Sequence, residues 1–271
     1  MATNTILLDV GGTFIKGADG RQTPIASGGS REAIALAMAQ AIGSLDSVQG
    51  IGVAIPGPFD YERGIFLMKH KYAAVYGERF RDLAGVPEGI PVKFMHDVNA
   101  PLAGAIKMLG LSSGNTALIT LGTGLGFSYA IRGEVQYGPG GSPARSLWNM
   151  PLAGGGILED NISARGILAA YSRKTGESGV SVLAIAQRAF ALEPAAKEVF
   201  TELGETLGDA LKDIFAELQI DTLLMGGQIS KSLELFSRPL QSRLHEVRIL
   251  PLPDGAVFEG LATLFDNNVT K

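Results

Sequence analysis

The hydrophobic positions of this chain fall into short uninterrupted runs and into longer stretches in which they recur every three or four residues. The short runs have the length of buried strands and end at turn-forming residues, so they predict strands. They cover Thr5–Val10, Ile15–Ala18, Ile51–Ile55, Val92–Met95, Thr116–Leu121, Phe127–Ile131 and Thr222–Met225. The periodic stretches predict helices, which lie after an N-cap at Ser30, over about Ala100–Leu109, over about Ile157–Ala170 and over Phe200–Leu218. Strands that alternate with helices indicate an α/β fold.

Three of the predicted strands end in a short glycine turn. The turns read Gly11-Gly12-Thr13, Gly122-Thr123-Gly124 and Gly226-Gly227. Such a turn can bring bare backbone N–H groups and a Thr hydroxyl against phosphate oxygens, where a side chain would block the approach. One turn alone is more often an ordinary one, since 36 of 271 residues are Gly. Three of them in different thirds of the chain, the first with Asp9 just ahead, favour a phosphate-binding protein.

Each half of the chain opens with a strand and a glycine turn, which predicts two domains with a cleft between them. A Gly/Ser cluster after Leu109 marks the boundary. We therefore expect a smaller N-terminal α/β domain over residues 1–109 and a larger C-terminal one over 110–271, whose terminal helix is free to pack back on the first domain.

Composition narrows the function. The net charge of −4 and the absence of a basic block argue against a nucleic-acid partner. No apolar run reaches the ~18 residues that a membrane span needs, and the first strand begins too early to leave room for a signal peptide. The chain has no Cys, which excludes disulfides and a thiolate nucleophile. We expect a cytoplasmic protein.

The segment His96-Asp97-Val98-Asn99 carries the strongest candidate chemistry. Phosphoryl transfer to a hydroxyl group needs a carboxylate that orients this hydroxyl and accepts its proton. Asp97 follows a strand and precedes a helix, which is the place for such a base. Alternatively, Asp97 or Asn99 is simply the N-cap of that helix. Asn99 with Pro101 in the first turn makes the better cap, which leaves Asp97 available.

The order Asp-x-Gly-Gly-Thr, Pro-Gly-Pro, Asp-x-Asn, Leu-Gly-Thr-Gly-x-Gly and Gly-Gly resembles the ROK sugar kinases of the actin-like ATPase superfamily, from about Ile6 to about Leu264. The resemblance implies a two-domain α/β fold of the actin-like (ribonuclease H-like) type with a central cleft. It implies that the first two glycine turns hold the triphosphate of ATP and that Gly226-Gly227 lies against the adenosine. Asp9 then organises Mg²⁺, through water.

The resemblance also implies a sugar site. Asp97 matches the general base, and His96 stands where the family usually has Asn. The turn at Pro56-Gly57 lies near the sugar in the family. Glu159 matches the sugar-binding Glu of a Leu-Glu-x-x-x-Ser-Gly helix, although an acid in a first helical turn is also favoured by the helix dipole alone.

The chain departs from the family pattern between Gly140 and Met150. The family's structural zinc needs cysteines, and a chain with three His and no Cys cannot build that site. Arg145 takes the place of a usual sugar-binding Glu in this loop, or else points to solvent. Trp148, the only Trp, either stacks on a sugar or packs in the core of the rebuilt loop.

We therefore expect an ATP- and Mg²⁺-dependent, zinc-free kinase of the glucokinase or hexokinase type that phosphorylates a sugar hydroxyl with Asp97 as base. Its partners are a small-molecule sugar and ATP, and a homodimer is compatible with these features. Two alternatives stay open at this point: a superfamily kinase with a non-sugar acceptor, and a non-catalytic ROK-like regulator that binds a sugar or a nucleotide.

Overall fold

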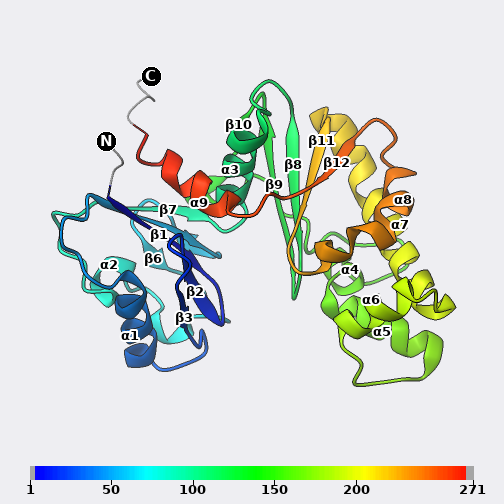
Figure 1. Ribbon diagram of the computed structural model, residues 1–271, viewed down its shortest axis with the longest axis horizontal. Coiled ribbons are helices and arrows are strands. Elements are labelled where there is room, and N and C mark those ends of the chain that lie inside the picture. Colours follow the sequence, from blue (N-terminus) through cyan, green and yellow to red (C-terminus); the bar gives the residue numbers. More distant parts are fainter. Residues whose placement is uncertain (1–3, 267–271) are drawn as a thin grey trace. The chain divides into compact units, whose positions relative to one another are not determined.

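A computed structural model describes residues 4–266 as two compact α/β units (Figure 1). Unit 1 combines the chain up to Gly110 with residues 135–144 and with the segment from Pro253 onward. Unit 2 contains residues 111–134 and 145–252. The predicted domain boundary after residue 109 lies one residue before the point at which the chain first passes from unit 1 to unit 2, after Gly110. The segments 135–144 and 253–266, which the sequence-based division placed in the C-terminal domain, group instead with unit 1.

The sheet of unit 1 has the strand order β3-β2-β1-β4-β7. Its strands are β1 (Thr5–Val10), β2 (Phe14–Gly17), β3 (Gln22–Pro24), β4 (Gly50–Ile55) and β7 (Val92–His96). Strands β1, β4 and β7 are parallel, whereas β1, β2 and β3 form an antiparallel meander. The carboxyl ends of the three parallel strands therefore meet at one edge, which is where ligands bind in open α/β sheets.

Helices and short elements complete unit 1. They are α1 (Arg31–Ile42), β5 (Phe59–Asp60), β6 (Ile65–Phe66), a 3₁₀ turn η1 (Ala73–Val75), α2 (Phe80–Leu83), α3 (Asn99–Leu109), a second 3₁₀ turn η2 (Pro139–Gly141) and α9 (Ala256–Thr263). The predicted cap of α1 is confirmed, because the Ser30 side chain accepts a hydrogen bond from the N–H of Ala33.

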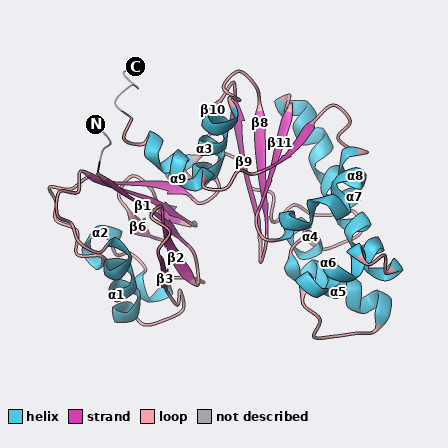
Figure 2. Cartoon of the chain, in the orientation of Figure 1, coloured by secondary structure: helices cyan, strands magenta, loops and turns pink. Residues whose placement is uncertain are grey.

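The second sheet has the order β10-β9-β8-β11-β12, with helices packed on it (Figure 2). Its strands are β8 (Thr116–Leu121), β9 (Leu125–Ile131), β10 (Glu134–Val135), β11 (Thr222–Gly226) and β12 (Arg248–Pro251). The other elements of unit 2 are α4 (Leu158–Ile162), α5 (Ala164–Thr175), α6 (Val182–Phe190), α7 (Pro194–Leu218), η3 (Ile229–Ser232) and α8 (Leu233–Gln241). Strands β8, β11 and β12 are parallel.

The helix predicted over residues 157–170 is two helices, α4 and α5. Ser163 between them has extended backbone angles, φ −79° and ψ 178°. The corner is tight, because a Cβ on Gly166 would lie 2.4 Å from the backbone of Asn161. Both helices bury apolar side chains in the same core, Leu158 and Ile167 among them. The periodic pattern of apolar residues therefore continues across the break and resembles that of a single helix.

Helices α3 and α9 cross at very close range within unit 1, which explains why the C-terminal segment groups there. A Cβ on Gly104 would lie 1.8 Å from the carbonyl oxygen of Ala256, and one on Gly260 would lie 1.8 Å from that of Ala100. Only glycine allows the two backbones to approach this closely.

Candidate active site

The residues predicted to do chemistry lie together at the carboxyl edge of the parallel strands of unit 1. Asp9 is the last residue but one of β1 and is paired in register with Ala54 of β4. Pro56 and Gly57 follow β4 directly. His96 ends β7 opposite Ile55, and Asp97 comes next. The fold thus brings together at one edge residues that are up to 88 positions apart in the sequence.

Asp9 is a perturbed carboxyl group. Burial, and after it the negative charge of Asp97, raise the pKa of Asp9 to about 6, against the opposite effect of Lys16 on the neighbouring strand. The carboxylates of Asp9 and Asp97 repel each other at the carboxyl ends of β1 and β7. This repulsion favours a bound cation or a shared proton at that place.

Asp97 is half-exposed and contacts His96. Its Oδ1 atom lies 2.8 Å from Nδ1 of His96, and 38% of its side chain is exposed. The same Nδ1 lies 3.2 Å from the N–H of Val98. One ring nitrogen cannot donate to a carboxylate and accept from an amide at once, so a ring that carries its hydrogen on Nδ1 makes the contact with Asp97 and one that does not makes the contact with Val98.

Two buried tyrosines support this edge, and the sequence analysis did not find them. The hydroxyl of Tyr61 donates to the carbonyl of Ile55 at 3.1 Å, and its ring packs against His96. The hydroxyl of Tyr72 donates to the carbonyl of Gly11 in the first glycine turn. Burial raises the pKa of both hydroxyls, so they stay protonated donors. A buried Tyr has no signature that separates it from the core in a sequence.

The predicted cap of α3 is wrong. The N-cap residue is Val98, and no side chain caps the helix. Asn99 is the first helical residue and is buried, with its amide nitrogen 3.5 Å from the carbonyl oxygen of Gly141. The contact of Asn99 with Gly141 links α3 to the segment 135–144. No local sequence pattern could reveal this contact. Asp97 has no capping role, so its carboxylate is available for other contacts.

The first glycine turn is tied down through its backbone. The N–H of Gly11 donates to the carbonyl of Phe14, and the N–H of Ser27 donates to that of Gly12. Thr13 is exposed, so its hydroxyl can reach a ligand.

Two glycine turns also lie at one edge in unit 2, because β8 and β11 are adjacent and parallel. A Cβ on Gly122 would meet no atom within 4 Å, and the side chain of Thr123 is exposed. Gly227 differs, since its φ is +87° and a Cβ there would lie 2.2 Å from the carbonyl oxygen of Leu121. A Cβ on Gly226 would press on the side chain of Leu252. The fold itself requires Gly227, whereas it leaves the backbone at Gly122 open.

The remaining predicted residues of unit 2 are already engaged. Arg145 pairs with Glu217 of α7, with 3.0 Å between nitrogen and oxygen. The carboxylate of Glu159 accepts a hydrogen bond from the N–H of Leu125 at 2.9 Å and pairs with Arg165. Trp148 is 48% exposed, so the core-packing alternative for this residue is wrong.

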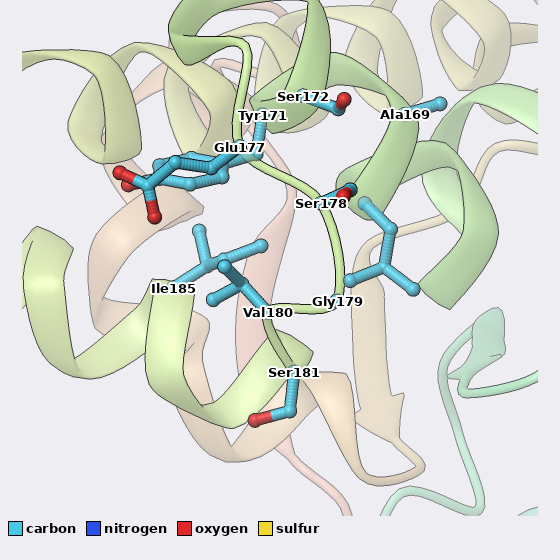
Figure 3. Close-up of a pocket in the computed structure, with 10 residues that line it drawn as sticks. Ala169, Tyr171, Ser172, Glu177, Ser178, Gly179, Val180, Ser181 and Ile185 are labelled. Atoms are coloured by element: carbon cyan, nitrogen blue, oxygen red, sulfur yellow. The ribbon is translucent and has the colours of Figure 1, made fainter.

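Unit 2 also has a surface pocket of about 520 Å³ between α5 and α6 (Figure 3). It is lined by Leu168, Ala169, Tyr171, Ser172, Glu177, Ser178, Gly179, Val180, Ser181 and Ile185. None of the predicted site residues lies there. Its most polar groups already have partners, since the hydroxyl of Tyr171 donates to Glu193 and Glu177 pairs with Arg188. We assign no chemistry to it.

Two absences are observed within residues 4–266. No group of three or more His, Asp or Glu side chains is arranged to hold a metal ion there. None of the helices in that range is both long and apolar enough to cross a membrane.

The chain is similar in sequence to known proteins of two kinds. The chain is 26% identical over 241 residues to a glucokinase of Halalkalibacterium halodurans, a match that covers 79% of this chain and 72% of the relative. It is 30% identical over 159 residues to a transcriptional regulator of Mycobacterium bovis, which covers 52% of this chain and 36% of the regulator.

A solved structure of a ROK family glucokinase from Streptomyces griseus, in complex with glucose and AMPPNP, superposes with a TM-score of 0.78. The match covers 96% of this chain and 98% of the other at 23% identity. This likeness confirms the predicted actin-like α/β fold. The model of the ROK family matches residues 6–253, nearly the whole chain. The protein belongs to the ROK family.

Proposed function

We propose that the protein is an ATP-dependent sugar kinase in which Asp97 is the general base. The observation that carries the proposal is the half-exposed carboxylate of Asp97 at the carboxyl edge of β7, which contacts His96, lies in electrostatic range of Asp9 and has no helix-capping role. In this reaction Asp97 accepts the proton of the sugar hydroxyl while that oxygen attacks the γ-phosphorus and ADP leaves.

The glycine turns suit a triphosphate. In unit 1 the turn at Gly11-Gly12-Thr13 lies beside Asp9, and in unit 2 the uncrowded backbone at Gly122 leaves room for phosphate oxygens, to which the exposed hydroxyl of Thr123 can donate. The turn at Gly226-Gly227 is assigned to the adenosine.

Asp9 fits a magnesium ion held through water, because Mg²⁺ prefers oxygen ligands and keeps several of its waters. Burial and the charge of Asp97 raise the pKa of Asp9, and a cation bound beside the carboxylate would lower it. Bound there, Mg²⁺ supplies neutralisation of the phosphate charge.

The sugar is assigned to Asp97, His96 and the Pro56-Gly57 turn in unit 1. A Cβ on Gly57 would lie 3.4 Å from Nε2 of His96, so the turn and the imidazole border the same small space. The glucokinase relatives support a sugar as acceptor. The sugar contacts of Glu159 and Arg145 stay predictions, as do the cytoplasmic location and the homodimer.

A regulator without turnover is the second candidate, favoured by the match to a transcriptional regulator and by the His at position 96. The two candidates differ in one measurement. We expect ADP release with Mg-ATP and at least one member of a panel of neutral, N-acetylated and acidic sugars, and a rate lower by about 10²–10⁴ with D97N. Sugar or nucleotide binding without turnover across the panel would establish the regulator instead.

A further inference from the structure

The corner between α4 and α5 holds the glycine turn after β8 by two hydrogen bonds. Oε2 of Glu159 accepts from the N–H of Leu125 at 2.9 Å, just after the turn. The N–H of Ala164 donates to the carbonyl of Gly122 at 2.9 Å, at the start of the turn. The turn is also closed internally, since the N–H of Gly122 donates to the carbonyl of Gly124 at 3.0 Å. The three turn residues are thus fixed at both ends.

Glu159 is a partly buried carboxylate with both oxygens engaged inside unit 2. Its Oε1 lies 2.7 Å from a guanidinium nitrogen of Arg165, and 19% of its side chain is exposed. Gly124 is packed directly against it, because a Cβ at that position would lie 2.8 Å from Oε2. A side chain at position 124 would therefore displace the carboxylate from Leu125.

We propose that Glu159 is a positioning residue for the nucleotide: it fixes the direction of the backbone N–H groups of Thr123 and Gly124, which bind phosphate, and Arg165 offsets its negative charge. The proposal rests on the proposed function, which assigns this turn to ATP. A carboxylate near a triphosphate is unfavourable unless a cation accompanies it, and Arg165 is that cation. Position 124 then requires Gly because a side chain there would collide with Glu159. Position 122 requires Gly because a side chain there would collide with the bound nucleotide.

The competing role for Glu159 is a sugar ligand, and the two roles change different constants. We expect E159A to raise the dissociation constant and the KM of the nucleotide at least tenfold and the KM of the sugar less than threefold. E159Q keeps an oxygen that can accept from Leu125 and should lose much less nucleotide affinity than E159A.

The matched control is D160N. Asp160 lies next to Glu159 in the first turn of α4 and also pairs with Arg165, at 2.9 Å, but it makes no contact with the turn among the described residues. D160N should leave both affinities within twofold of the wild type. A rise in the sugar KM of E159A with unchanged nucleotide affinity, measured by calorimetry with AMPPNP, would overturn the proposal.

A second pair of variants covers the case in which E159A folds poorly. G124A should weaken nucleotide binding in the wild-type background and add little in E159S, whose side chain is too short to reach Leu125 and to be displaced by the new Cβ. Equal effects in both backgrounds would contradict the role assigned to Glu159.

Amide hydrogen exchange separates failure of this proposal from failure of the proposed function. If the wild type binds no nucleotide, the kinase assignment fails, and exchange in the ligand-free protein still decides whether Glu159 holds the turn. Peptides that contain Leu125 should exchange faster in E159A than in D160N. The same rate in both variants would refute the positioning role.

Discussion

At the scale of single residues, the kinase proposal depends on the carboxylate of Asp97. We expect D97N to lower kcat by about 10²–10⁴, which is what a positioned general base contributes, and to leave nucleotide affinity within a few fold. Steady-state kinetics with the best sugar of the panel measures this. D82N, an exposed acid of α2 in the same unit, is the control. Near wild-type kcat in D97N would remove Asp97 from the catalytic step.

Asp9 predicts a pH dependence of stability in metal-free buffer. The folded protein keeps the Asp9 proton up to about pH 6, whereas an unfolded Asp releases it near its ordinary value of 3.8. The free energy of unfolding should therefore fall as the pH rises from about 4 to about 6, by up to about 3 kcal/mol from this group.

D9N removes that term, so the stability of the variant relative to the wild type should increase through the same pH window. Urea unfolding followed by circular dichroism with chelator present gives the difference at each pH. A difference that is constant from pH 4 to pH 7 would show that Asp9 titrates normally.

Arg145 tests the altered loop. Its pair with Glu217 leaves 37% of its side chain exposed, and an exposed pair of this kind contributes about 0–1 kcal/mol. If Arg145 leaves Glu217 to bind the substrate, R145A should lower kcat/KM for acidic or N-acetylated sugars and not for glucose, because a guanidinium only donates hydrogen bonds. E217A, which frees Arg145, is the partner variant. If R145A has the same kcat/KM as the wild type for every sugar, Arg145 takes no part in substrate binding.

At the scale of elements, the glycine turns of unit 2 separate folding from ligand binding. Gly122 has room for a Cβ and its φ is not in the left-handed region, so G122A should unfold at the same urea concentration as the wild type but bind nucleotide more weakly. Gly227 has a positive φ, and a Cβ there would clash with the backbone of Leu121. G227A should therefore lower the free energy of unfolding by at least about 1–3 kcal/mol. Urea curves and AMPPNP calorimetry on both variants decide this. Unchanged nucleotide binding in G122A would remove this turn from the phosphate site.

The division into α4 and α5 also belongs to this scale. An unbroken helix over residues 158–175 would carry the N–H of Ala164 into helical bonding and away from Gly122. The break at Ser163 thus leaves the N–H of Ala164 available to donate to the carbonyl of Gly122, which holds the glycine turn after β8.

At the scale of the whole molecule, the last helix completes the first unit. The approach of α3 and α9 leaves no room for a Cβ on Gly104 or Gly260, so G260L should cost several kcal/mol and lower the stability of unit 1 first. Hydrogen exchange of the β1 and β4 peptides, compared with the β8 peptide, measures where the loss falls. Gly255, with open space around it, offers G255A as a milder control that is strained only by its φ of +78°. Equal loss of protection in both units would contradict this assignment.

The longer strands, the glycine turns and the order of the chemical residues could be predicted from the sequence alone, whereas short strands such as β3 and β12 were missed. These features are local: a strand ends where the apolar run ends, and a turn that needs Gly carries Gly. The position of Asp97 left it as either a base or a helix cap, and the roles of Asp9 and Asp97 came from the ROK resemblance, which rests on the order of the motifs.

What those residues touch could be seen only in the folded molecule. The cap at Val98, the bond from Leu125 to Glu159, the raised pKa of Asp9 and the glycine crossing of α3 with α9 all depend on atoms that are distant in the sequence. Local periodicity reports which face of an element is buried, but carries no record of the backbone or the charge that comes to lie against it. The partners of a side chain are fixed by packing, and packing is a property of the folded molecule.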